Sequence, residues 1–130
     1  MKSYTDIEQS RKLAEILPIE SADMHFHYDY DFDELESIPT ITEEDNHFVL
    51  FPQDVECWSL AALLQLLPLE IPDRYDDNDY KLNIDMIDKM PIYRSYEMNH
   101  SLFPCGFGKD TLLDNIVESI IWLNDNNYLE

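Results

Sequence analysis

The stretch MHFHYDYDF, residues 24–32, decides how the first half of the chain is interpreted. Aromatic and polar side chains alternate along it with a period of two, which is the period of a β-strand. The aromatic set is expected on one face of that strand: Phe26, Tyr28, Tyr30 and Phe32. The polar set is expected on the other: His25, His27, Asp29, Asp31 and Asp33. The pattern predicts a half-buried strand with a wet, acidic outer face.

Three further strands are predicted from shorter apolar patterns. HFVLF at 47–51 is expected to pair with the first strand as a hairpin, across the acidic connection at 33–46. Alternation between apolar and polar residues predicts another strand at 80–87, and IYRSYEM at 92–98 is its expected hairpin partner. The stretch NHSLFPCGFGKD, 99–110, is expected to be a loop, since it holds both glycines of the chain.

Three helices complete the predicted elements. The first covers residues 6–17 and begins with a capping-box pattern formed by Thr5 and Glu8. The second lies within CWSLAALLQLLP, 57–68, which is apolar on nearly every side, so we expect it to be the most buried helix. The third lies within 110–129, where a broad apolar stripe follows a capping residue at Asp110 or Thr111.

The elements follow the order α-β-β-α-β-β-α over a single expected domain, residues 1–130. Strands that arrive as hairpins pair in antiparallel fashion, and helices can then cover one face of the sheet. The sequence therefore predicts a two-layer α+β fold with one antiparallel four-stranded sheet and its helices on one face.

The charge balance limits the classes of partner. Twenty-eight acidic residues against eight basic ones give a net charge of −20, which disfavours direct binding to nucleic acid or to an anionic membrane and favours a basic protein partner. The first residues lack the apolar core of a signal peptide, and no apolar run approaches the roughly 18 residues of a membrane span. We expect a cytoplasmic protein in which Cys57 and Cys105 are reduced thiols.

His25 and His27 form an H-x-H pair that would place both imidazoles on one strand face, roughly 7 Å apart at the backbone. Such a pair can bind zinc when a third ligand arrives, and Asp29 or His47 are the candidates. The alternative is that these polar residues only face water. In that case we expect neither a metal nor another cofactor. DRYDDNDYKL, 73–82, lacks the spacing of a calcium loop, and the glycine-containing stretch 99–110 lacks a complete phosphate-binding motif. No catalytic residues are predicted.

Four segments resemble a family of small, acidic, uncharacterised proteins of gut Bacteroidales and their prophages. They are YTDIEQSRKLAEILPIESADM (4–24), CWSLAALLQLLP (57–68), YKLNIDM (80–86) and DNIVESIIWLNDNNYL (114–129). The similar segments span nearly the whole chain, except residues 25–52 and 91–109, which are much less alike. The resemblance implies a single cytoplasmic domain from a mobile element, and it implies no activity, cofactor or binding residue.

Three functions are compatible with these observations. The first is a non-enzymatic protein, monomeric or homodimeric, that binds another protein through acidic residues: Asp29, Asp31, Asp33, Glu34, Glu36, Glu43 and Glu44. The second is a nucleic-acid mimic, because the charge of −20 is similar to the ~21 phosphate charges of B-DNA over the ~36 Å width of such a domain. The third is a metal-binding protein that uses His25 and His27.

Overall fold

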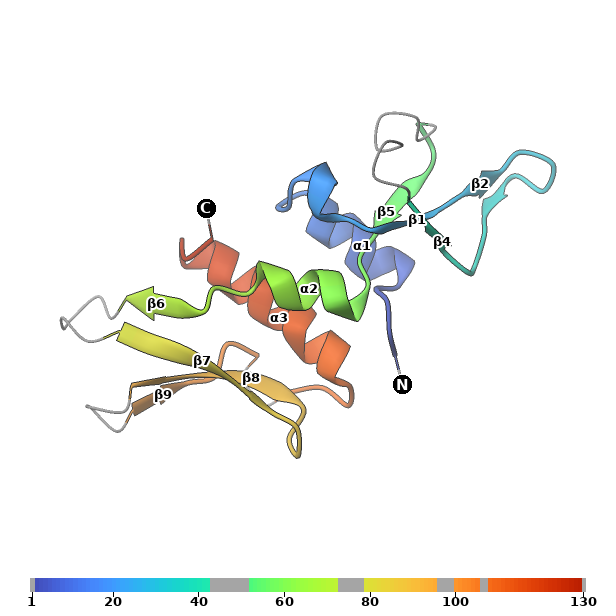
Figure 1. Cartoon of the computed structure of the whole chain (residues 1–130). Helices are drawn as coiled ribbons and strands as arrows, with labels where there is room; N and C mark the ends of the chain where they lie inside the picture. The colour runs from blue at the N-terminus through green and yellow to red at the C-terminus, as the bar shows by residue number, and fades with distance from the viewer. Residues whose placement is uncertain (1, 43–51, 73–78, 96–99, 106–107, 130) are drawn as a thin grey trace. The chain divides into compact units, whose positions relative to one another are not determined.

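The computed structural model describes residues 2–42, 52–72, 79–95, 100–105 and 108–129, and the chain forms two compact units (Figure 1). The first, here the N-terminal unit, is Ser3–Leu64. The second, here the C-terminal unit, is Gln65–Glu130 together with Met1–Lys2. The single domain expected over 1–130 stays a prediction. In the described residues, no helix has both the length and the apolar character that crossing a membrane requires.

The N-terminal unit begins with α1, Ile7–Ala14, which is shorter than the predicted 6–17. Its capping box lies one residue later than predicted, because Asp6 accepts a hydrogen bond from the Gln9 backbone and the Gln9 side chain accepts one from the Asp6 backbone. Thr5 has a different role. Its hydroxyl is buried, accepts from the Trp58 N–H at 3.1 Å and shares a hydrogen bond with Ser10 at 2.7 Å.

A three-stranded antiparallel sheet of order β4-β1-β5 follows, and its strands are short. They are β1 (Met24–Phe26), β4 (Thr40–Ile41) and β5 (Val55–Cys57). A separate two-stranded ladder joins β2 (Tyr28–Asp29) to β3 (Glu34–Leu35). The predicted partner strand at 47–51 lies outside the described residues.

The prediction of one continuous strand over 24–32 is wrong. The chain leaves β1 after Phe26 and turns after Asp29, whose carboxylate accepts hydrogen bonds from the backbone N–H groups of Asp31 at 2.9 Å and Phe32 at 3.4 Å. This Asx turn satisfies the backbone locally and competes with strand extension. Tyr30 and Phe32, which were expected to face the core, are exposed instead.

The core of the N-terminal unit gathers around Trp58, whose indole N–H donates to the Ser21 hydroxyl at 2.9 Å. Ser21 ends a short 3-10 helix, Ile19–Ser21. The other large buried side chains include Leu13, Phe26 and Leu63.

Helix α2, Leu60–Leu66, was expected to be the most buried helix, and that prediction is wrong. Only Leu63 of its seven residues is buried.

The C-terminal unit is a four-stranded antiparallel meander in the order β6-β7-β8-β9. Its strands are β6 (Glu70–Pro72), β7 (Asp79–Asp85), β8 (Met90–Ser95) and β9 (His100–Leu102). The predicted hairpin of the second half is confirmed as β7–β8. Strand β9 corrects the prediction of a loop over 99–110, where the three-residue run His-Ser-Leu is too short to show alternation.

The fold class α+β and three helices are confirmed, but one four-stranded sheet built from both predicted hairpins is wrong. The described strands form sheets of three, two and four strands. The four-stranded sheet is made of strands from the second half of the chain alone, because β6 and β9 pair with the predicted hairpin. The strands of the first half pair among themselves.

Helix α3, Leu112–Asp125, lies across one face of this sheet and contacts β8 (Figure 1). The predicted cap at Thr111 is confirmed, since its hydroxyl accepts from the Asp114 N–H at 3.1 Å. At the other end Asn127 takes a left-handed conformation with φ 62°, and the Tyr128 N–H returns to the Leu123 carbonyl at 2.8 Å. Beneath the helix Tyr93 is buried, and its hydroxyl donates to the Pro68 carbonyl at 2.7 Å.

Candidate protein-binding hairpin

Residues 28–38 form the acidic hairpin, which consists of β2, a turn, β3 and the three residues that follow β3. Its register places Tyr28 opposite Leu35 and Asp29 opposite Glu34. Two acidic residues therefore occupy paired positions of this short ladder.

Two backbone hydrogen bonds join the base of the acidic hairpin to the rest of the N-terminal unit. The Tyr28 N–H donates to the Asp54 carboxylate at 2.8 Å, and the Glu36 N–H donates to the His27 carbonyl at 2.9 Å. The Asp54 side chain is only 2% exposed, so the carboxylate that holds Tyr28 is itself fixed by burial. The base is therefore anchored.

The turn at 30–33 is held by its own polar side chains. Asp33 has φ 54°, a conformation that Asp tolerates better than most residues, and its carboxylate accepts from the Tyr28 hydroxyl. This hydrogen bond is the main cause that raises the pKa of Tyr28 to about 12, ahead of burial and the charge of Asp33. The rings of Tyr28 and Tyr30 also meet edge to face, with centroids 4.9 Å apart. The turn is thus preorganised.

Apolar side chains stand in solvent along the acidic hairpin. Phe32 is 75% exposed and Ile38 is 71% exposed, and Tyr30 is also exposed. Single exposed apolar residues are ordinary on protein surfaces, but three within nine residues of a fixed hairpin are a feature of interaction surfaces.

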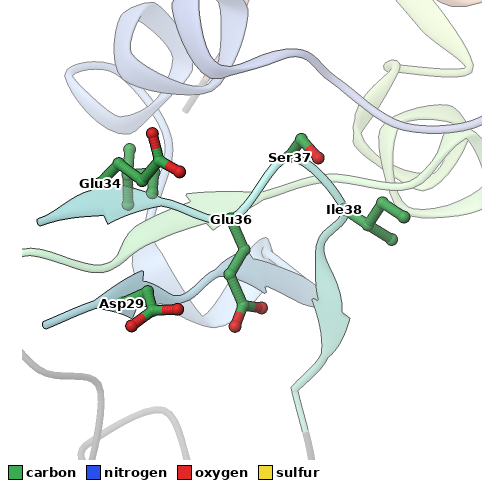
Figure 2. A pocket seen from close by; sticks show the side chains of 6 residues that line it. Asp29, Glu34, Glu36, Ser37 and Ile38 are labelled. Carbon is green, nitrogen blue, oxygen red and sulfur yellow. The ribbon is translucent and has the colours of Figure 1, made fainter. Parts of the chain in front are cut away.

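A pocket of about 440 Å³ lies along the acidic hairpin, and Figure 2 shows the residues that line it. They are Asp29, Glu34, Leu35, Glu36, Ser37 and Ile38. The carboxylates of Asp29 and Glu36 project on the same side, whereas Glu34 projects on the other. The pocket therefore combines three acidic side chains, two of which project on the same side, with the apolar surface of Leu35 and Ile38.

The structure brings together five of the seven acidic residues that the sequence proposed for partner binding. Asp29, Glu34 and Glu36 line the pocket, and Asp31 and Asp33 lie in the turn. The other two, at positions 43 and 44, lie outside the described residues. Of the three aspartates expected in one row, Asp29 alone lies in a strand.

The two histidines of the predicted H-x-H pair bond to different partners. His25 lies in β1 and its Nδ1 is 2.7 Å from the Thr42 hydroxyl, while Nδ1 of His27 is 3.4 Å from the Asp54 carboxylate. Within the ranges that the structure describes, no three His, Cys, Asp or Glu residues are grouped so that they could hold a metal ion. The candidate ligand His47 lies outside those ranges, as do 73–78 of the acidic stretch and 106–107 of the glycine-containing stretch.

Sequence reasoning missed the exposed apolar residues and the role of Asp54. The sequence YDYDFDE contained a signal for the exposed apolar residues. The carboxylate of an Asp can accept hydrogen bonds from the backbone N–H groups two and three residues later, which makes an Asx turn. No local pattern in the sequence distinguishes Asp54 from the exposed acidic residues. Its buried carboxylate contacts His27 and Tyr28, which are distant from it in the sequence.

Comparisons with protein-family models, with curated proteins and with solved structures give no match. The functional interpretation of the chain therefore rests on its own geometry and chemistry.

Proposed function

We propose that this protein is a non-enzymatic binding protein whose acidic hairpin receives a basic segment of another protein. The observation that carries the proposal is that one hairpin holds three exposed apolar residues, Tyr30, Phe32 and Ile38, and a pocket in which two carboxylates project on the same side. Aromatic side chains are common anchors of protein interfaces because they bury a large area at a small loss of conformational entropy.

A lysine or arginine side chain of the partner fits the chemistry of the pocket. Its aliphatic stem can pack on Leu35 and Ile38 while its charged end reaches Asp29 and Glu36. Asp29 already accepts two backbone hydrogen bonds in the turn, so its position is fixed before binding. A preformed site loses less entropy on association than one that must first be ordered.

The net charge of −20 supports a basic partner for a second reason. A strong negative field increases the rate at which a basic protein meets this surface, and salt weakens that effect. We expect association with a pronounced salt dependence, in which the apolar anchors contribute most of the residence time.

A nucleic-acid mimic makes a different demand on the acidic residues. It needs carboxylates in rows that imitate phosphates, free to contact basic side chains of a DNA- or RNA-binding protein. Here Asp29 alone of the three aspartates lies in a strand, and Asp33 is bonded to Tyr28 in the turn, so the expected row is not formed. Protein binding through a mixed apolar and acidic surface is the better supported function, and the experiment below also separates the two.

The experiment is affinity capture from a lysate of the source organism, elution with a salt gradient, identification by mass spectrometry and titration of the purified partner. Two hairpin variants, Glu36→Lys and Phe32→Ala, are compared with two matched controls in the C-terminal unit, Asp88→Lys and Ile87→Ala. Asp88 and Ile87 are both exposed, and Ile87 is 91% exposed. Each control therefore repeats a charge reversal or an apolar truncation at a residue outside the acidic hairpin.

We expect each hairpin variant to weaken binding by about tenfold or more, and neither control to do so. Equal losses in the control variants would assign the binding to net charge or to another surface and would overturn the proposal. A captured partner that binds DNA or RNA, and that added DNA displaces, would establish mimicry instead.

A further inference from the structure

We propose that the acidic hairpin binds the open face of the four-stranded sheet in a second copy of this chain, where Lys81 and Arg94 lie side by side. This assignment of the partner rests on the proposed function, because it takes the acidic hairpin as a docking surface. It goes further in naming what docks there. The contact joins the N-terminal unit of one molecule to the C-terminal unit of another.

A row of polar side chains crosses the open face of the sheet. The register sets them in the order Glu70, Lys81, Arg94 and Ser101, one from each of the four strands. Tyr93, which precedes Arg94 in β8, is buried beneath α3, so the alternation of a strand turns Arg94 to the opposite face. Lys81 and Arg94 are both exposed, and directly opposite residues have Cβ atoms about 4.5–5.5 Å apart. Two cations therefore stand together in solvent.

Neighbouring groups on the sheet hold these two cations only loosely. The Lys81 Nζ lies 4.0 Å from the Glu70 carboxylate, at the outer limit of an ion pair, and both side chains are more than half exposed. The Arg94 Nε donates to the Ser101 hydroxyl at 3.4 Å. Among the residues that the structure describes, Arg94 forms no ion pair with an acid. Carboxylates of a second molecule can therefore approach both cations.

The acidic hairpin carries carboxylates in a matching arrangement. Asp29 lies in β2 and Glu36 follows β3, and Figure 2 shows their carboxylates projecting on the same side. Two neighbouring carboxylates can meet two neighbouring cations, and a guanidinium group can bind a carboxylate through two parallel hydrogen bonds. Glu36 is exposed, and its backbone N–H is fixed to the His27 carbonyl at 2.9 Å. Its side chain therefore starts from an anchored position.

Both surfaces also carry exposed apolar side chains. Phe32 and Ile38 are exposed on the acidic hairpin, and Phe103, two residues after Ser101, is 52% exposed. Arginine and aromatic residues are enriched in protein interfaces, and the burial of aromatic rings adds an attraction that salt does not screen. The chain itself thus supplies both halves of a contact that combines opposite charges with apolar surface.

The net charge gives this contact a characteristic response to salt. Two copies that each carry −20 repel one another over a Debye length of ~30 Å at about 10 mM salt, which shrinks to ~8 Å at about 150 mM. Charges in direct contact are screened less than charges farther apart than a Debye length. We expect self-association to strengthen over this range, whereas capture of a basic protein weakens.

The test is sedimentation equilibrium of the full chain at low salt and at about 150 mM salt. Wild type is compared with Arg94→Glu, with Glu36→Lys and with the chain that carries both changes. We expect each single reversal to weaken self-association by about tenfold or more, and the double variant to recover most of the loss because opposite charges face each other again. The double variant also keeps the net charge of −20, since its two reversals cancel.

Lys89→Glu is the matched control, because Lys89 is exposed in the β7–β8 turn and its reversal changes the net charge as Arg94→Glu does. We expect it to change self-association little. A wild type that stays monomeric at both salt concentrations, an equal loss in Lys89→Glu, or a double variant without recovery would overturn this assignment of the partner. The proposed function fails separately, since a monomeric chain whose capture of another protein depends on Glu36 and Phe32 would leave it in place.

Discussion

At the scale of single residues, Asn115 joins two loops of the C-terminal unit to α3. Its amide nitrogen donates to the carbonyls of Lys89 and Lys109, the latter at 3.1 Å, and its amide oxygen accepts the Lys109 N–H. The side chain is fully buried, and a hydrogen bond made by a buried polar group is costly to lose. Lys89 lies at the end of the β7–β8 turn and has φ 57°, a strained conformation for this residue. The hydrogen bond from Asn115 to the Lys89 carbonyl therefore also holds this end of the turn.

We predict that Asn115→Leu lowers the free energy of unfolding by about 2–4 kcal/mol, since it removes the three hydrogen bonds that this buried amide makes to the backbone of Lys89 and Lys109. Urea denaturation followed by circular dichroism measures the loss. Asn124→Leu is the control, because Asn124 lies on the same helix and is not buried. A loss in Asn115→Leu no larger than in this control would show that the three hydrogen bonds contribute little.

The buried thiol of Cys57 predicts a loss of stability at alkaline pH. Burial raises its pKa above the ordinary value of 9.0, and hydrogen bonds from Thr5 and Ser10 oppose the rise only in part. Above that ordinary value the unfolded thiol loses its proton while the folded thiol keeps it, so the unfolded state binds fewer protons. The contribution is thus fully present below pH 9 and is lost as the pH rises through the folded pKa.

We therefore expect the free energy of unfolding to fall less steeply between pH 8 and pH 10 in Cys57→Ala than in the wild type. Tyr93, whose pKa is also raised by burial, is present in both proteins, and its contribution cancels in the comparison. Urea titrations at several pH values give the two slopes. Identical slopes would mean that Cys57 does not titrate differently in the folded and unfolded states.

At the scale of elements, the open side of the four-stranded sheet places two basic residues directly across a ladder. Lys81 of β7 is in register with Arg94 of β8, and both are exposed. Lys81 also lies 4.0 Å from Glu70 on β6, while the Arg94 Nε reaches the Ser101 hydroxyl at 3.4 Å. Like charges in directly opposite positions destabilise a sheet, so this pair has a cost.

We predict that Arg94→Glu stabilises the protein by about 0.2–1 kcal/mol, because a cross-strand pair of opposite charges replaces the repulsion. Thermal unfolding at low salt is the measurement. Lys89→Glu makes the same change in net charge at an exposed turn position and is expected to give no gain. If both variants destabilise alike, the added negative charge outweighs the local pair.

The elements differ in how far the sequence could predict them. Helix α3 was predictable because its apolar stripe runs for almost four turns and Thr111 marks its start. The region 24–33 was not, because a period of two fits a strand and also fits an Asx turn in which Asp29 bonds to its own loop. The acidic residues of the candidate site lie close together in space because they are close in sequence. The exposure of Phe32 could not be predicted in this way, because the alternating pattern places its side chain on the buried face of a strand and the turn places it in solvent.

At the scale of the whole molecule, the net charge of −20 opposes the folded state, since folding brings like charges closer together. The ion pairs among the described residues include a partly buried one, Lys2 with Asp114 at 2.7 Å, and an exposed one, Lys12 with Glu8 at 3.8 Å. Exposed pairs of this kind contribute about 0–1 kcal/mol each. Repulsion among the 28 acidic residues should therefore dominate the response to salt.

We predict that sodium chloride raises the free energy of unfolding, with most of the gain between about 10 mM and 150 mM, where the Debye length falls from ~30 Å to ~8 Å. Urea denaturation at a series of salt concentrations is the measurement. A gain that continues linearly to molar salt would indicate a general salt effect on apolar surface instead of charge screening. A fall in stability with salt would mean that local ion pairs outweigh the repulsion. Over the same range, added salt should weaken the capture of a basic partner, because it screens the attraction between opposite charges. Stability and binding are therefore expected to respond to salt in opposite directions.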